Sequence, residues 1–361
     1  MALPEYFQFQ DRTKVIYGQG TLSSVGEEAK LAGGAKALIV TDKIISKLGY
    51  AETVANSLRD AGIEVVMTYD DVPQDSSATM IQTLYEDVKK LGGADICVAI
   101  GGGSVLDTTK MVNLLLSEGG DLLDDHQGAY LQEKPLNPMV AIPTTAGTGS
   151  EVTFAAVIKD TEQHQKISFI SPFFAPNTAI LDPDVTLSMP PGITAGTGMD
   201  ALTHAIEALH SATSEPVSDA LALGAIRMIN EFLPVAVKDG KNVEARGQML
   251  IASTIAGIAF TNSMVGVVHA IAHSIGGIAG VPHGLANSLM LPWCMEFNLE
   301  YCTDKYAQSA YAMGVIPTGD PAADAETGIA KVRELISKTG LPTRLRDVGV
   351  TEEQFEDIVG M

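Results

Sequence analysis

Residues 96–110 read ICVAIGGGSVLDTTK, an apolar run that leads into three glycines and then a helical pattern. An uninterrupted apolar run of this length is typical of a strand that is buried on both faces, as in a parallel sheet. Similar runs and helical patterns alternate through the first half of the chain: strand-like at residues 37–41, 64–69 and 140–142, helix-like at residues 53–61 and 80–91. This alternation predicts an α/β domain built on a parallel sheet.

Two of these predicted strands end in loops that suit a phosphate group. Three glycines follow the strand at residues 96–100, and residues 143–151 read PTTAGTGSE after the next one. Glycine lets the backbone approach a phosphate closely, and the helix that follows supplies free N–H donors with a partial positive charge. A plain tight turn with Ser104 as the helix N-cap would be the commoner use of one such loop. Two such loops at adjacent strand ends favour phosphate binding, because ligands of parallel sheets bind at that edge.

A nucleotide cofactor is therefore expected, although neither Gly-x-Gly-x-x-Gly after the first strand nor a Walker A loop is present. The expected cofactor-binding residues of the two loops are Gly101, Gly102, Gly103, Ser104, Asp107, Thr144, Thr145, Thr148, Gly149 and Ser150. Asp42, at the end of the strand at residues 37–41, can accept hydrogen bonds from a ribose 2′-hydroxyl and would repel a 2′-phosphate. It favours NAD over NADP, although a helix N-cap would explain Asp42 equally well.

The second half of the chain has a different character. Strand signals stop at the prolines near residues 183–191, which we interpret as the domain junction. Helical patterns follow at residues 195–210, 218–232, 243–260, 267–279 and 284–297. We predict a nucleotide-binding domain over residues 1–186 and an all-helical domain over residues 187–361, with a cleft that brings nucleotide and metal together.

The helical half carries five polar residues in apolar surroundings. Asp200 and His204 are one helical turn apart, as are His269 and His273, and His283 follows Pro282. One such pair alone would more often be a local hydrogen bond. Buried carboxylates and imidazoles are costly unless they are paired or bind a cation, so the set predicts a divalent-metal site. These donors suit Fe²⁺, Zn²⁺ or Mn²⁺ and do not decide among them.

Composition narrows the class of protein. The 361 residues suggest two domains, and the net charge of −21 argues against nucleic-acid or anionic membrane partners. Residues 1–6 lack a signal-peptide pattern, and apolar segments such as residues 251–260 look too short to span a bilayer. The three cysteines, Cys97, Cys294 and Cys302, show no Cys-x-x-Cys spacing and fit a reducing compartment. We expect a cytoplasmic enzyme.

In these motifs the chain resembles the iron-dependent (group III) alcohol dehydrogenases. Four stretches carry the resemblance: residues 101–107 with Lys110, residues 143–151, residues 198–207, and residues 269–273 with residues 282–287. The resemblance implies an N-terminal Rossmann-like domain that binds NAD(P) and an all-helical, dehydroquinate synthase-like domain that binds the metal. It implies the ligand set Asp200, His204, His269 and His283, and Fe²⁺ as the first choice of ion.

The resemblance assigns further roles. His273 matches a non-ligand histidine near the nicotinamide and is the candidate proton relay. Lys166 matches a lysine near the cofactor ribose. Ala155, Phe260 and Val265 fall where family members line the substrate pocket, and their apolar side chains predict a small, mostly apolar primary alcohol or its aldehyde. A homodimer or larger homo-oligomer is also implied, and family members usually run further at the C-terminus.

Three alternatives remain open at this stage. A glycerol or other polyol dehydrogenase, or a dehydroquinate synthase relative, would share the fold and a similar ion. A hydroxyacid–oxoacid transhydrogenase would retain its NAD, although the sequence shows no extra basic cluster for a carboxylate. A metal- or nucleotide-binding protein without activity belongs to another class. NADH formation from a short primary alcohol with iron(II) would separate that last class from an enzyme.

Overall fold

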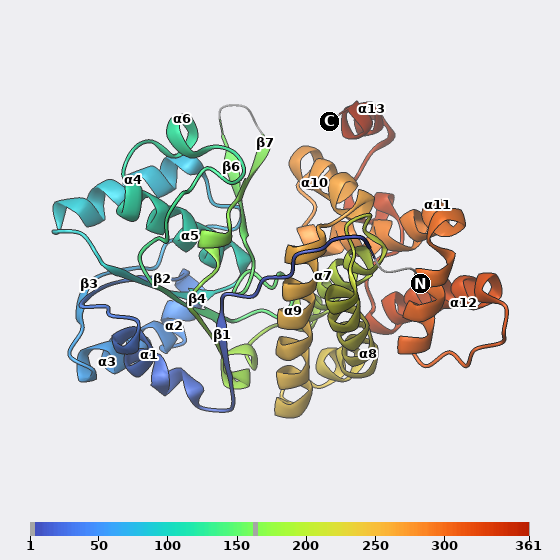
Figure 1. Cartoon of the computed structure of the whole chain (residues 1–361), viewed down its shortest axis with the longest axis horizontal. Coiled ribbons are helices and arrows are strands. Elements are labelled where there is room, and N and C mark those ends of the chain that lie inside the picture. The colour runs from blue at the N-terminus through green and yellow to red at the C-terminus, as the bar shows by residue number, and fades with distance from the viewer. Residues whose placement is uncertain (1–3, 162–164, 361) are drawn as a thin grey trace. The chain divides into compact units, whose positions relative to one another are not determined.

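The computed structural model describes residues 4–161 and 165–360, which form two compact units (Figure 1). The sheet unit holds residues 11–145 and 150–186, and the helical unit holds residues 187–360 together with residues 4–10 and 146–149. These last two short segments were assigned to the first domain by sequence but pack with the helices. Gln10 N, for example, donates to Asn262 Oδ1 at 2.8 Å. Residues 1–3, 162–164 and 361 lie outside the described residues, so part of the N-terminal stretch in which no signal-peptide pattern was expected is not described.

The sheet unit is built on a six-stranded sheet in the order β1-β8-β5-β4-β2-β3, with every neighbouring pair parallel. The strands are β1 (Lys14–Tyr17), β2 (Lys36–Val40), β3 (Glu64–Tyr69), β4 (Ile96–Gly101), β5 (Met139–Pro143) and β8 (Thr178–Leu181). The predicted parallel sheet is confirmed. Sequence analysis did not find β1 and β8, because each has only four residues and β1 is an exposed edge strand.

Helices cover both faces of this sheet, which explains its uninterrupted apolar strands. In β4, Cys97 and Ala99 point into one apolar cluster, and Ile96, Val98 and Ile100 point into the other. Successive side chains of a strand alternate between faces, so a strand buried on both sides shows no polar alternation. The helices are α1 (Val25–Leu31), α2 (Lys43–Lys47), α3 (Tyr50–Asp60), α4 (Ala78–Lys90), α5 (Gly103–Glu118) and α6 (Leu122–His126).

A two-stranded antiparallel hairpin adds to this unit. It consists of β6 (Ala155–Asp160) and β7 (Gln165–Ile170) and was not predicted from the sequence. The strand-like alternation of each is short and contains lysines, so the pattern is weak. Short 3₁₀ helices complete the described chain: Thr21–Ser24, Pro172–Phe174, Pro183–Thr186, Leu345–Val348 and Glu352–Gln354.

The helical unit confirms the five long helical patterns. Its helices are α7 (Pro191–His210), α8 (Pro216–Lys238), α9 (Val243–Ser263), α10 (Val267–Ala279), α11 (His283–Ala312), α12 (Pro321–Thr339) and α13 (Phe355–Gly360). Helix α12 was not predicted. Its sequence is rich in alanine and charge, so its apolar stripe is narrow.

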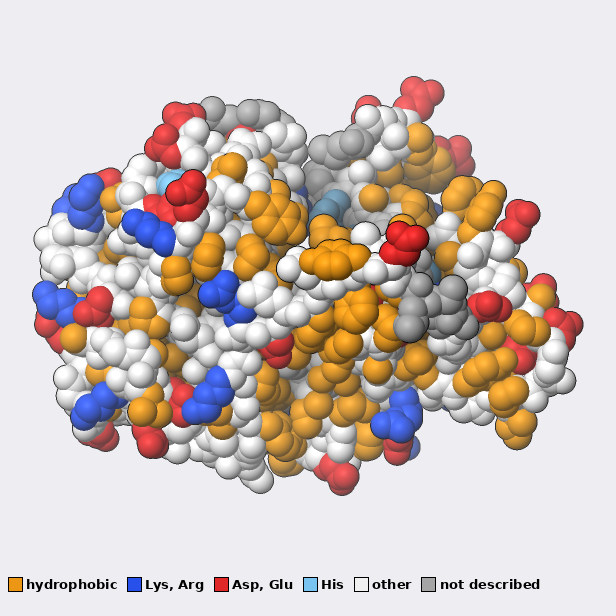
Figure 2. All heavy atoms as spheres, in the orientation of Figure 1, with side chains coloured by type: hydrophobic (Ala, Val, Ile, Leu, Met, Phe, Trp, Pro, Cys, Tyr) orange, Lys and Arg blue, Asp and Glu red, His pale blue; other side chains and the backbone are white. Residues whose placement is uncertain are grey.

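By length and composition alone, helix α8 could cross a membrane, and the bent pair α9–α10 would also pass if read as one span. The expectation that the apolar segments are too short was therefore wrong for α8. Only 33% of the apolar 18-residue window of α8 is buried. Apolar side chains gather over α8 and α9 on the face shown in Figure 2. Core helices of globular proteins pass the same test, so one or two such helices are weak evidence for a span.

Candidate metal centre and cofactor loops

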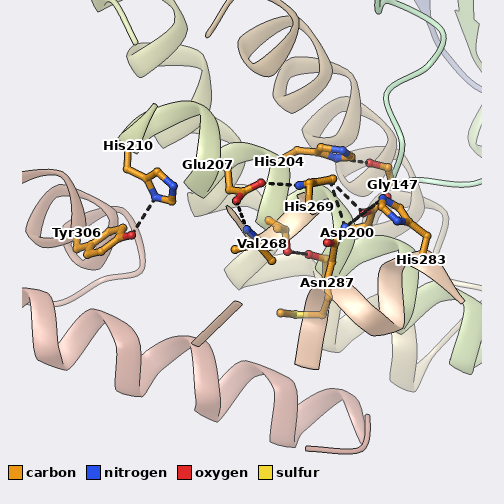
Figure 3. A network of polar contacts seen from close by, with 12 residues as sticks. Gly147, Asp200, His204, Glu207, His210, Val268, His269, His283, Asn287 and Tyr306 are labelled. Carbon is orange, nitrogen blue, oxygen red and sulfur yellow. Dashed lines mark hydrogen bonds and ion pairs between the residues drawn. The ribbon is translucent and has the colours of Figure 1, made fainter. Parts of the chain in front are cut away.

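Helix α7 presents two carboxylates and one histidine along one face. Asp200, His204 and Glu207 are spaced by four and then three residues, so they lie on successive turns (Figure 3). All three are buried, and Glu207 is fully inaccessible. Most of the other buried residues of the helix are apolar.

Helices α10 and α11 complete a cluster of potential metal ligands around Asp200. One ligand atom each from Asp200, His269 and His283 lie within 4.8 Å of one another. The Asp200 Oδ1 atom is 3.5 Å from His283 Nε2 and 3.9 Å from His269 Nε2. The structure thus brings together three of the four ligands that the sequence predicted.

His204, the fourth predicted ligand, lies beside this cluster without joining it. Its ring stacks on the rings of His269 and Phe260, with centroid distances of 4.5 and 4.2 Å. Its Nδ1–H donates to the Gly147 carbonyl at 3.2 Å, which leaves Nε2 with its lone pair. That tautomer is the one a ligand histidine needs.

The donor set fits a cation because acceptors outnumber donors. Asn287 Nδ2 lies 2.7 Å from Asp200 Oδ1 and 3.2 Å from each Nε2 of His269 and His283. An amide has two hydrogens and cannot satisfy three acceptors. Asn287 Oδ1 is itself buried and has no hydrogen-bond partner within residues 4–161 and 165–360. A cation among the three acceptors would supply the missing positive centre.

The pKa directions agree with such a centre. Burial opposes ionisation of Asp200, but its histidine neighbours, led by His204, outweigh burial and lower the pKa of the carboxyl. Burial, reinforced by His204 and His283, places the pKa of His269 well below its usual range. A carboxylate beside a neutral His269 ring is the protonation state in which these two residues bind metals.

Two residues of the centre were missed by sequence analysis. Glu207 accepts a hydrogen bond from His269 Nδ1 at 2.5 Å, and Asn287 contacts the ligands as described. Their spacing was visible, since Glu207 is three residues after His204 and Asn287 is four after His283. That signal was overlooked because an acidic or amide residue at helical spacing more often faces solvent.

His273, the predicted proton relay, lies close to the cluster without belonging to it. It is one helical turn after His269 on α10, with its ring centroid 5.1 Å from that of His283. The side chain is partly exposed, unlike that of His269. This position suits an exchange of protons with solvent.

Close backbone contacts hold the helices of the centre in place. A Cβ on Gly284 would lie 2.3 Å from the Gly196 carbonyl oxygen, so α11 meets α7 where only glycine fits. A Cβ on Gly149 would lie 2.7 Å from the Cα of Gly257 on α9. The loop after β5 is thus divided, because Gly149 and its neighbour Thr148 pack with the helical unit.

In the sheet unit, the glycine loop after β4 leads directly into a helix, as the sequence pattern suggested. Helix α5 begins at Gly103 with Gly102 as N-cap, and none of the described side chains caps it. The alternative reading of Ser104 as N-cap was wrong, since Ser104 lies inside the helix and its Oγ accepts from Asp75 N at 3.2 Å. Val105 N and Leu106 N donate to the Gly102 carbonyl at 3.0 and 3.1 Å, and no side chain of the described residues caps the amides before them.

The other predicted cofactor residues of this unit contact each other or nearby backbone. Asp107 accepts from Ser150 Oγ at 2.6 Å and from Val157 N at 2.9 Å, which ties α5 to β6. Thr144 N donates to the Gly101 carbonyl at 3.0 Å, and Thr145 lies beside Gly102. These bonds join the loops after β4 and β5 at the carboxyl edge of the sheet.

Lys166 and Asp42 also have protein partners. Lys166 Nζ lies 2.7 Å from Asp75 Oδ1. Asp42 caps α2, with Oδ1 accepting from Ile44 N at 2.8 Å and from Ile45 N at 3.0 Å. The N-cap alternative for Asp42 is therefore confirmed. The cap uses only Oδ1, and the position of Asp42 just after β2 remains compatible with the predicted contact to a ribose.

The predicted substrate residues are found in different elements. Phe260 covers one face of the His204 ring, and Val265 lies in the turn between α9 and α10. Ala155 is the first residue of β6 in the sheet unit, where its carbonyl accepts from Lys110 Nζ at 2.8 Å.

Comparison with known proteins decides the family. Residues 12–183 match the model for iron-containing alcohol dehydrogenases, and residues 194–361 match the C-terminal model of the same family. The chain belongs to the iron-containing alcohol dehydrogenase family. It is an oxidoreductase that acts on alcohols, which confirms the resemblance seen in its motifs.

Among its relatives, the NAD-dependent methanol dehydrogenase of Bacillus methanolicus is 40% identical over 94% of this chain and 89% of that protein. The 1,3-propanediol dehydrogenase of Klebsiella pneumoniae is 41% identical over 94% of this chain and 88% of that protein. The crystal structure of a 1,3-propanediol oxidoreductase is also similar, with 40% identity and a TM-score of 0.95, covering 99% of this chain and 93% of that one.

Proposed function

We propose that this alcohol dehydrogenase interconverts small primary alcohols and aldehydes, with NAD as cofactor and one divalent ion, iron by family, held by Asp200, His204, His269 and His283. The acceptor-rich cluster of Asp200, His269 and His283, in which one amide faces three acceptors, carries this proposal. NAD-dependent relatives support the choice of cofactor. A cytoplasmic location, supported by three free cysteines, and a homo-oligomeric state belong to the same proposal.

We assign a separate role to each residue of the site. When bound, the ion would act as a Lewis acid toward the alcohol oxygen, and NAD would accept the hydride. Asp200 supplies the negative charge of the centre, while Glu207 and the Gly147 carbonyl orient His269 and His204. His273, beside His283 and partly exposed, carries the proton between substrate and solvent. The glycines at the start of α5, Gly102 and Gly103, would hold the pyrophosphate.

Asp42 should set the preference for NAD. The variants Asp42→Asn and Asp42→Gly both remove the charge that repels a 2′-phosphate, and asparagine also keeps a helix cap. We expect both to raise kcat/KM with NADP relative to NAD, with little change in thermal stability for Asp42→Asn. Steady-state kinetics with the two cofactors measure this. Equal use of NADP and NAD by the wild-type protein would refute the role of Asp42.

The substrate class follows from Ala155, Phe260 and Val265, none of which offers a side-chain hydrogen bond to a second hydroxyl. Along ethanol, 1-propanol and 1-butanol at saturating NAD, kcat/KM should rise, because each added methylene gains apolar contact. It should fall for glycerol. The series measures this directly, and a preference for glycerol or a hydroxy acid over 1-butanol would contradict it.

A diol is the second candidate substrate. Two relatives at 41% identity are 1,3-propanediol dehydrogenases, so 1,3-propanediol belongs in the same series. In this diol the second hydroxyl is separated from the reacting carbon by two methylenes. A kcat/KM for 1,3-propanediol well above that of 1-propanol would select this alternative.

A further inference from the structure

Glu207 is a fully buried carboxylate whose two oxygens bind two different donors. Oε2 accepts from His269 Nδ1 at 2.5 Å, and Oε1 accepts from the backbone N–H of Val268 at 2.7 Å. Burying a carboxylate is costly unless strong hydrogen bonds compensate it. Its place on α7, one turn beyond His204, puts it behind the cluster, on the far side of His269 from Asp200 (Figure 3).

The contact with His269 decides which ring nitrogen carries the proton. A carboxylate can only accept, so Nδ1 must donate to it, and the proton of a neutral ring is then absent from Nε2. That Nε2 atom is the one that faces Asp200 Oδ1, at 3.9 Å. Asn287 Nδ2, 3.2 Å from the same Nε2, fits an unprotonated nitrogen there.

The contact with Val268 fixes the backbone that carries His269. Val268 lies in the first turn of α10, whose N-cap, Gly266, offers no side chain to cap it. Glu207 takes this capping role from another helix. A Cβ on Gly266 would lie 2.9 Å from Glu207 Oε1 and 3.2 Å from His210 Nε2, so the turn into α10 is shaped around the carboxylate.

We propose that Glu207 is a positioning residue of the metal centre: by accepting from His269 Nδ1 and from the first turn of α10, it holds the lone pair of His269 Nε2 toward the cation. This role rests on the proposed function, because it presupposes that His269 is a ligand. The carboxylate acts through His269 and not on substrate. Loss of the Glu207 carboxylate should therefore weaken metal binding, which can be measured without a catalytic assay.

The variant Glu207→Gln tests this with little change in size. A carboxylate accepts from both donors, whereas a glutamine side chain has one acceptor and one donor group. If its oxygen takes the Val268 N–H, its NH₂ group faces Nδ1 and moves the ring proton to Nε2, where it blocks the ligand atom. Loss of a partner behind a metal ligand typically weakens metal binding about 10–100-fold. We expect a loss in that range for Zn²⁺, measured by competition with a chromophoric chelator.

Glu215→Gln is the matched control. Glu215 is also buried in the helical unit and accepts from two backbone amides, Val217 N at 2.8 Å and Ser218 N at 2.6 Å, neither of which belongs to a histidine. It should lose similar thermal stability and keep wild-type Zn²⁺ affinity. Unchanged affinity in Glu207→Gln, or an equal loss in both variants, would overturn the positioning role.

A second measurement does not depend on the folding of any variant. In metal-depleted wild-type protein, ¹⁵N NMR of His269 should show Nδ1 protonated and Nε2 unprotonated, and the opposite tautomer would overturn the proposal. The wild-type Zn²⁺ titration distinguishes failure of the metal centre from failure of the Glu207 role. Absence of Zn²⁺ binding there would refute the metal centre itself, and with it the role of Glu207.

Discussion

Replacing His269 by alanine should abolish both stoichiometric metal binding and alcohol oxidation. His269 is 4% exposed, contacts Asp200 and Asn287 through Nε2, and is the ligand whose orientation is fixed from behind by Glu207. Removing it leaves the buried carboxylates of Asp200 and Glu207 with fewer partners, so thermal stability should fall as well. Elemental analysis of the purified variant and NADH formation measure the two losses.

His273→Ala serves as the contrasting variant on the same helix. Because His273 lies outside the three-residue cluster, we expect full metal content and a reduced rate. Full metal content in His269→Ala would show that the ligand assignment is wrong. Loss of metal in His273→Ala would instead make His273 a ligand and exclude it as a proton relay.

A single methyl group at Gly284 should disrupt the centre through packing alone. In Gly284→Ala the new Cβ would meet the Gly196 carbonyl at 2.3 Å, a backbone atom that cannot rotate away. Helix α11 must then move from α7, which separates His283 from Asp200. Overpacking of this kind costs about 1–3 kcal/mol in the free energy of unfolding. Urea unfolding and Zn²⁺ titration should show lower stability and weaker binding.

Gly192→Ala provides the control for this prediction. Gly192 is an exposed residue of α7, and a Cβ added there would have no atom of the described residues within 4 Å. Alanine is a better helix former than glycine, so stability should stay equal or rise by roughly 0.5–1 kcal/mol. Wild-type stability and metal affinity in Gly284→Ala would contradict the tight α7–α11 contact.

The fold could be read from the sequence where burial is strong. Strand β4 shows an uninterrupted apolar run because helices cover both faces of the sheet, and α10 was placed at its observed ends. The four-residue strand β1 and the hairpin β6–β7 were missed, because short, partly exposed strands leave little periodicity. Their existence depends on pairing with distant segments, which local patterns do not show.

The sequence allowed the candidate metal ligands to be predicted, but not the residues that hydrogen-bond to them. Asp200 and His269 stood out because each belongs to a polar pair at helical spacing in apolar surroundings, and His283 because it follows Pro282. The role of Glu207 depends on a contact with Val268, 61 residues away, and that of Asn287 on Asp200, 87 residues away. Ser104 had the sequence position of a cap, but the turn places Gly102 there. Such roles are set by tertiary packing and become visible only in the folded chain.

The most direct test of the account is an anaerobic iron(II) titration of metal-depleted wild-type protein, with NAD and 1-propanol present and NADH formation followed by absorbance. We predict no activity without the ion, a linear rise with added iron, and saturation at one ion per chain. Full activity in the metal-depleted protein would contradict the proposed metal centre. One bound ion per chain without NADH formation from any alcohol of the series would contradict the proposed reaction.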